Sequence, residues 1–184
     1  MSALPLAAWR IRAVQLLVLL MAAPLGLGVL GHLQPDVAAA ARSLSPLALQ
    51  PSTGSGTQAL SIFAHNLRVV ALPLLGAAAL AGLRFHPGIR DPLRAVLDAV
   101  ICLSLVGNVT LLALSLAGYG LGRLAPWLPH LPVEFAALAI ALDVYLTARG
   151  PGALSGRLLL VAAAVCVVAL ALAAVIETYA TPGA

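Results

Sequence analysis

The chain alternates between long apolar runs and short polar segments. Five of the apolar runs are long enough to cross the hydrocarbon core of a bilayer, which takes about 20 helical residues. We therefore predict an all-α protein, a polytopic bundle of about five transmembrane helices that forms a single integral membrane domain over residues 1–184. The predicted spans are residues 11–33, 60–83, 93–119, 131–147 and 157–179. The fourth run is the shortest, so hydropathy alone supports it least.

The first apolar run also has features of a secretory signal peptide. Arg10 and Arg12 precede it, and the alanines at 38–40 resemble a cleavage site. Its apolar core is longer than the 7–15 residues of a signal peptide, so we expect a retained helix. The segment that follows, residues 34–59, is predicted to be an outward loop in which residues 36–43 can form a short interfacial helix.

Composition excludes a soluble domain. Only 9% of the residues are charged and 62% are hydrophobic, whereas soluble domains carry about 25% charged residues. The net charge of +4 does not indicate nucleic-acid binding, because all ten basic residues are arginines that lie singly or in small groups at the ends of the apolar runs. The absence of lysine beside abundant alanine, glycine and arginine is also typical of a bacterial genome rich in G and C.

The arginines predict the orientation of the chain. Cytoplasmic flanks of membrane spans are enriched in basic residues. With the N-terminus in the cytoplasm and the C-terminus outside, only two arginines flank the outer ends of the spans, namely Arg42 and Arg123. The inner flanks then hold Arg10, Arg12, Arg84, Arg90, Arg94, Arg149 and Arg157. We therefore expect a multi-pass protein of the bacterial plasma membrane.

Ionisable residues inside spans are costly and mark either function or pairing between helices. In the expected topology Arg68 lies roughly 10 Å below the outer surface, at a rise of 1.5 Å per residue. Glu134 lies near the same surface in the fourth span. We predict an outer cluster of Asn66, Arg68, His130 and Glu134, in which the long Arg68 side chain reaches toward Glu134.

A second cluster is predicted near the cytoplasmic side, from Asp98 and Asp143. Arg84, Arg94 or Arg149 can neutralise these carboxylates. Asn108 lies deeper in the third span, where an amide usually bonds a neighbouring helix. Three interpretations of these polar groups stay open: pairs that hold helices together, which we favour, a conduction path or substrate site, and catalysis.

The sequence contains little that resembles a known catalytic or cofactor-binding motif. His130 and Glu134 are four residues apart, but no His-Glu-x-x-His zinc signature is present and Pro132 lies between them. No Gly-x-Ser-x-Gly elbow offers a serine nucleophile. The sequence therefore predicts no catalytic, cofactor or metal site, and a protein that is not an enzyme. Cys102 and Cys166 lie in apolar runs and are interpreted as small core residues.

Three segments carry a resemblance to a known family. Residues 62–71 read Ile-Phe-Ala-His-Asn-Leu-Arg-Val-Val-Ala, residues 107–108 read Gly-Asn before an apolar run, and residues 128–137 read Leu-Pro-His-Leu-Pro-Val-Glu-Phe-Ala-Ala. The last segment is similar to Leu-Pro-His-Gly-x-x-Glu-x-x-Ala of the stage II sporulation protein M family of bacterial membrane proteins. The chain departs from that pattern at Leu131, where the family usually has glycine. By position, the family-type residues are Asn66, Arg68, Asn108, His130 and Glu134.

The resemblance implies a membrane anchor or scaffold rather than an enzyme. Founding members of that family act beside partners that remodel peptidoglycan. We therefore expect a component of a cell-envelope assembly whose partners are the lipid bilayer and other envelope proteins. A second copy of this chain is a further candidate partner: the small-residue pair Ala78 and Gly82 fits a dimer interface, although we favour packing within one chain for this pair. Nucleic acid is not an expected partner. The alternative function is a transmembrane subunit of a transporter, in which the cluster around Glu134 lines a polar path.

Overall fold

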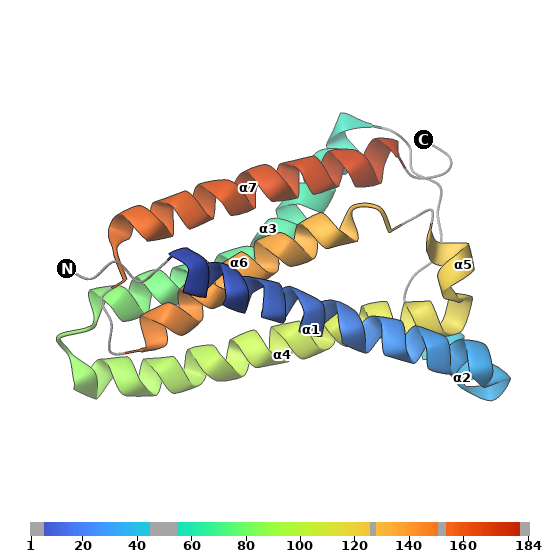
Figure 1. Ribbon diagram of the computed structural model, residues 1–184, viewed down its shortest axis with the longest axis horizontal. Helices are drawn as coiled ribbons and strands as arrows, with labels where there is room; N and C mark the ends of the chain where they lie inside the picture. The colour runs from blue at the N-terminus through green and yellow to red at the C-terminus, as the bar shows by residue number, and fades with distance from the viewer. Residues whose placement is uncertain (1–5, 45–54, 126–127, 151–153, 181–184) are drawn as a thin grey trace.

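The computed structural model describes residues 6–44, 55–125, 128–150 and 154–180. Within these ranges all regular secondary structure is helical (Figure 1). The elements are α1 (Leu6–Leu33), α2 (Pro35–Leu44), α3 (Gly56–Gly82), α4 (Pro87–Tyr119), α5 (Leu121–Leu124), α6 (Leu131–Arg149) and α7 (Gly156–Tyr179).

Five helices are long and apolar enough to cross a membrane, namely α1, α3, α4, α6 and α7. They confirm that each of the five predicted apolar runs forms a helix long enough to span a membrane. The largest difference in a starting position is that of α4, which begins at Pro87 rather than at residue 93. Proline is tolerated in the first turn of a helix, where no intrahelical hydrogen bond is lost. Serine residues cap the N-termini of two other spans. The side chain of Ser55 accepts a hydrogen bond from the backbone N–H of Gln58 in α3, and that of Ser155 accepts one from the backbone N–H of Leu158 in α7.

Successive spans run in opposite directions, so the bundle has two distinct ends (Figure 1). We call one the arginine end: there α3 and α6 finish, α4 and α7 begin, and Arg84, Arg90, Arg94, Arg149 and Arg157 gather. We call the other the glutamate end, because α6 begins there with Glu134 in its first turn and α7 finishes there with Glu177 in its last.

Helix α6 occupies the centre of the bundle, in contact with α1, α3 and α7. Half of its residues are buried inside the protein, against 18–28% of the apolar stretches of the other four spans. A helix surrounded by other helices meets little lipid, so it can carry polar residues that a lipid-facing helix could not. This fits the modest mean hydropathy of α6, which is the second lowest of the five spans.

Apolar side chains from four spans form one continuous core around α6. Leu80 of α3, Val144 of α6 and Leu170 of α7 are among its completely buried members. Cys166 lies in this core as predicted, but Cys102 is exposed on α4. The remaining buried members are Val70, Ala77, Ile101, Ala137, Leu138, Ala141, Leu142, Tyr145, Ala148 and Ala162.

The segment after α1 contains a helix, as predicted for residues 36–43. Helix α2 packs against the C-terminal part of α4, where Arg42 donates a hydrogen bond from Nη1 to the carbonyl oxygen of Gly118 at 2.8 Å. The predicted loop 34–59 is therefore partly helical, and its residues 45–54 lie outside the described ranges.

Glycines let α1 and α4 approach closely. A Cβ atom at Gly31 would overlap the backbone of Ala117, and one at Gly28 would lie 3.1 Å from Cβ of Leu116. Small residues at helix crossings allow this kind of backbone contact in membranes. The predicted small-residue position Gly82 is different, because it is exposed and a Cβ there would meet nothing within 4 Å.

We expect Gly31→Ala to lower the free energy of unfolding by about 1–3 kcal/mol, the usual cost of overpacking a close contact. The matched control is Gly26→Ala on the same helix, where an added Cβ meets nothing within 4 Å. That control should raise stability by about 0.5–1 kcal/mol, because alanine is a better helix former than glycine. Unfolding in mixed detergent–SDS micelles measures both. Equal effects of the two substitutions would contradict the close crossing of α1 and α4.

Candidate functional site

Polar side chains from three helices meet at the glutamate end. Glu134 lies in the first turn of α6, which begins at Leu131 and has Pro132 as its second residue. A carboxylate in a first turn is favoured by the helix dipole. Asn66 of α3 donates a hydrogen bond from its Nδ2 to Oε1 of Glu134, so this pair links α3 to α6.

His130 and Glu177 complete the group. His130 is the N-cap residue of α6 and is 7% exposed, and its Nε2 lies 3.6 Å from Oε2 of Glu177 on α7. Burial lowers the pKa of His130 to about 4, so the imidazole is neutral at pH 7. Ligand-type atoms of His130, Glu134 and Glu177 all lie within 4.8 Å of one another. We call these three residues the glutamate cluster.

The structure brings together three of the residues predicted for the outer cluster, Asn66, His130 and Glu134. It adds Glu177 of α7, a residue that sequence reasoning did not assign to any cluster. The signal for Glu177 was its position: in the expected topology it lies at the outer end of the fifth span, level with Glu134.

Arg68 does not join the cluster, and the predicted contact with Glu134 is wrong. Its side chain is exposed on α3, and among the described residues it pairs with no carboxylate. Successive helical residues are 100° apart, so Arg68 points about 200° away from Asn66. Because Asn66 occupies the side of α3 that faces Glu134, Arg68 faces away from α6.

Asn108 is also separate. It is exposed on α4, and its Nδ2 donates to the carbonyl oxygen of Ser104, one turn back in the same helix, at 2.8 Å. The predicted hydrogen bond to a neighbouring helix is therefore wrong. An amide on the outer surface of a helix can satisfy itself on its own backbone, as this one does.

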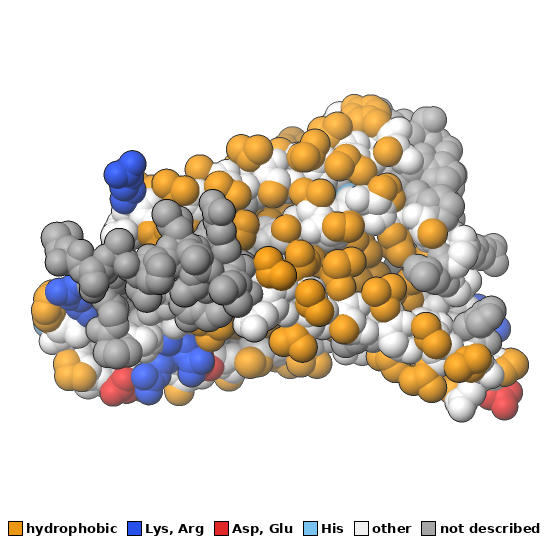
Figure 2. All heavy atoms as spheres, in the orientation of Figure 1, with side chains coloured by type: hydrophobic (Ala, Val, Ile, Leu, Met, Phe, Trp, Pro, Cys, Tyr) orange, Lys and Arg blue, Asp and Glu red, His pale blue; other side chains and the backbone are white. Residues whose placement is uncertain are grey.

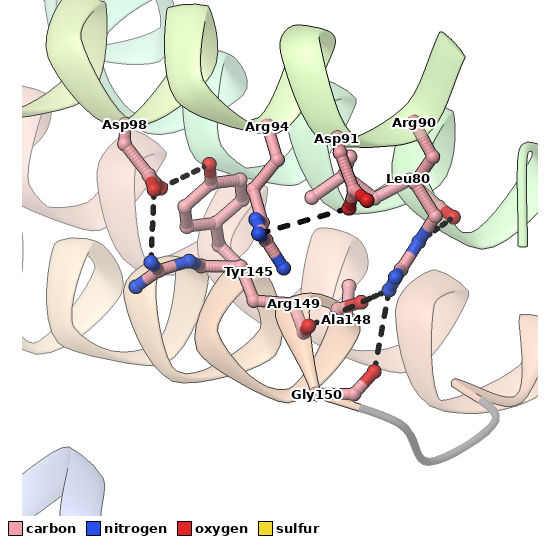
Figure 3. A network of polar contacts seen from close by, with 9 residues as sticks. All are labelled: Leu80, Arg90, Asp91, Arg94, Asp98, Tyr145, Ala148, Arg149 and Gly150. Carbon is pink, nitrogen blue, oxygen red and sulfur yellow. Dashed lines mark hydrogen bonds and ion pairs between the residues drawn. The ribbon is translucent and has the colours of Figure 1, made fainter. Parts of the chain in front are cut away.

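A second polar group lies near the arginine end (Figure 3). Asp98 of α4 accepts a hydrogen bond from the Tyr145 hydroxyl at 2.7 Å and pairs with Nη2 of Arg149 at 2.8 Å. Arg149 is thus the predicted partner that neutralises Asp98, whereas Arg94 pairs with Asp91 in its own helix at 3.6 Å.

Glycine makes room for the tyrosine in this group. A Cβ atom at Gly76 of α3 would lie 3.1 Å from Cε2 of Tyr145, so the ring packs directly on the α3 backbone. The ring is thereby fixed with its hydroxyl directed to Asp98, and α3, α4 and α6 are joined at one point.

Asp143 is completely buried on α6, but on another side of the helix from the Asp98 group. It precedes Tyr145 by two residues, which is about 200° around the helix. The structure therefore divides the predicted second cluster: Asp98 lies with Tyr145 and Arg149, and Asp143 lies apart from them.

Arg90 makes the most extensive contact at this end (Figure 3). Its Nη2 donates to the carbonyl oxygens of Ala148 at 2.9 Å and Gly150 at 3.2 Å, and its Nε donates to that of Leu80 at 3.4 Å. The last carbonyls of a helix have no intrahelical partner, so one guanidinium of α4 satisfies the ends of α3 and α6. Sequence reasoning assigned Arg90 to topology alone, because its partners are backbone atoms.

Comparisons with protein-family models, with curated proteins and with solved structures found no match to this chain. The site is therefore defined by the residues of this chain alone. The described residues form an all-helical protein with five helices suited to cross a membrane and a partly buried polar group near each end of the bundle.

We expect Arg90→Gln to lower the free energy of unfolding by about 1.5–3 kcal/mol, since hydrogen bonds from a charged donor are lost and helix-end carbonyls stay buried. Arg84→Gln is the control, because it removes the same charge at the same end. Arg84 is exposed and its Cζ lies 4.3 Å from the Phe85 ring centroid, a contact worth less than about 1 kcal/mol. Detergent–SDS unfolding compares the two variants, and equal losses would show that charge rather than carbonyl capping matters.

Proposed function

We propose that this chain is a non-enzymatic integral membrane component of a bacterial cell-envelope assembly, acting as a scaffold. The observation that carries the proposal is the apolar packing between the two polar groups. Around the middle of α6 most core side chains are alanine, leucine and valine of α3, α6 and α7, with the carboxyl of Asp143 buried among them. A scaffold requires a well-packed bundle, whereas a transporter requires a continuous polar route through it.

The cavity at the glutamate end also favours a scaffold. It has a volume of about 200 Å³ and lies between α1, α4 and α6. Met21, Leu25, Leu116, Leu131 and Phe135 are among its lining residues, and every side chain that lines it is apolar. Such a cavity suits a hydrocarbon chain or an apolar side chain better than a hydrated solute.

The resemblance to the stage II sporulation protein M family adds support. Asn66, His130 and Glu134 are three of the residues that carry it, and they lie together where α3 meets the start of α6. In this chain these three family-type residues therefore join α3 to the start of α6. Arg68 and Asn108, which also carry the resemblance, are exposed on the surface and are available to partners.

Charge placement supports an orientation. Most of the basic side chains visible in Figure 2 gather at the end where α4 and α7 begin, and the surface between the ends is mainly apolar. By the tendency of basic residues to stay inside, the arginine end faces the cytoplasm. The glutamate end, α2 and the C-terminus then face outward. In a multi-pass protein of the bacterial plasma membrane this is the side on which peptidoglycan-remodelling partners lie.

The alternative is a transmembrane subunit of a transporter. One observation favours it: Asp143 is a completely buried carboxyl on the central helix, about 13 Å along the axis from Glu134 at 1.5 Å per residue. Acidic groups inside membrane bundles commonly mark ion or proton routes. A cytoplasmic ATPase would then dock at the exposed turn around Phe85.

Photo-crosslinking in native membranes separates the two functions. One probe replaces Leu44 at the end of α2 and the other replaces Phe85, and both positions are well exposed at opposite ends. We expect the probe at 44 to capture envelope proteins identified by mass spectrometry, and the probe at 85 to capture no ATPase. Capture of a nucleotide-hydrolysing protein at 85 would support the transporter instead.

Flux through the purified protein in liposomes provides the second measurement. We expect no ion or solute flux above protein-free vesicles, with Asp143→Asn identical to wild type. Flux that Asp143→Asn abolishes while the protein stays folded would overturn the scaffold and assign Asp143 to a transport route.

A further inference from the structure

The glutamate cluster has the composition of a metal site. It offers one imidazole nitrogen and two carboxylate oxygens, and the three ligand atoms lie within 4.8 Å of one another. Two ligands of one zinc ion are roughly 3.4 Å apart when each metal bond is about 2.0–2.2 Å and the geometry is tetrahedral. Side-chain rotations that move each ligand atom by about 1 Å would bring separations of up to 4.8 Å to this spacing.

His130 provides an independent observation. Its side chain is 9% exposed, and Nδ1 has no hydrogen-bond partner among the described residues. Nε2 faces Glu177 at 3.6 Å, which is beyond an ordinary hydrogen bond. Burying Nδ1 without a hydrogen-bond partner costs free energy. Nε2, which faces Glu177, is the nitrogen from which a metal bond would offset that cost.

The two carboxylates support the same conclusion. Glu134 and Glu177 come from the start of α6 and the end of α7 and meet in a half-buried place. Like charges this close repel each other strongly where water is scarce, and a divalent cation between them removes the repulsion. Asn66 holds Glu134 from the α3 side, which is how outer hydrogen bonds orient a metal-binding carboxylate.

We propose that the glutamate cluster binds a divalent transition-metal ion through His130 Nε2 and one carboxylate oxygen each of Glu134 and Glu177. Three protein ligands leave a further coordination position for water or a partner group. One imidazole with two carboxylates suits Zn²⁺, Mn²⁺, Fe²⁺ or Co²⁺, whereas Ca²⁺ and Mg²⁺ prefer oxygen ligands alone. The Glu177 side chain is 32% exposed, which gives the ion a path from the surface.

The ion would tie the start of α6 to the end of α7, and through Asn66 to α3. Sequence reasoning predicts no metal site here, because the third ligand lies on a different helix far along the chain. The proposal does not rest on the scaffold function, since a structural ion fits a scaffold and a transporter equally.

The test is metal binding by the purified full-length chain in lipid nanodiscs after treatment with a chelator. Isothermal titration with Zn²⁺ should give one tight site per chain, and Co²⁺ should give the visible absorption of a four-coordinate ion. We expect Glu177→Gln and His130→Gln to weaken Zn²⁺ binding by at least about 100-fold, because outer-shell partners alone are worth 10–100-fold. Glu134→Gln should do the same while keeping an oxygen that can accept the bond from Asn66.

Two exposed histidines provide matched controls. His65 lies on α3 near the glutamate end and His86 lies at the arginine end, so His65→Gln and His86→Gln remove imidazoles that can bind zinc adventitiously. Both variants should keep wild-type affinity. Thermal unfolding checks the fold: zinc should raise the midpoint of the wild type but not that of Glu177→Gln, because a ligand stabilises only a state that binds it.

The proposal fails if the folded wild-type chain takes up no stoichiometric Zn²⁺. It also fails if binding survives in Glu177→Gln and Glu134→Gln but is lost in His65→Gln or His86→Gln. Should His130→Gln not fold, the two glutamate variants decide the outcome, since glutamine keeps the size of the side chain. Failure of the metal site would leave the crosslinking result unaffected, so the two proposals can be judged separately.

Discussion

The packing of α6 against α1, α3 and α7 is the contact on which the rest of the structure depends. It buries a helix that carries a histidine, two acidic residues and a tyrosine at or between its ends, and each helix around α6 provides apolar surface. Where water is scarce, a polar side chain must find its partner within the protein. The positions of Asn66, Asp98 and Glu177 on the surrounding helices follow from this requirement.

The five long helices could be predicted from sequence because the thickness of a bilayer sets the length of apolar helix that crosses it. A run of about 20 apolar residues predicts a span regardless of its neighbours, and all five predicted runs correspond to helices. The burial of α6 could not be predicted in the same way. Its short and polar-containing run reads as a weak span, although in the fold those polar residues are evidence of its central place.

The polar groups were predictable along the helix axis but not around it. A rise of 1.5 Å per residue places Asn66, Arg68 and Glu134 at a similar level, and two of the three do meet. The direction in which each side chain points depends on how the helix is rotated against its neighbours, and only packing fixes that rotation. Arg68 was therefore misplaced, and Arg90 was missed because its partners are carbonyl oxygens that no sequence pattern marks.

The two ends of the bundle are closed by groups of different chemistry. At the arginine end a guanidinium holds helix carbonyls, and arginine keeps its charge at every pH that a cell meets. At the glutamate end an imidazole and two carboxyl groups from α6 and α7 converge instead. The carbonyl contacts of Arg90 therefore persist whatever the acidity of the medium, so the joint between α3, α4 and α6 at the arginine end does not depend on the chemistry at the other end.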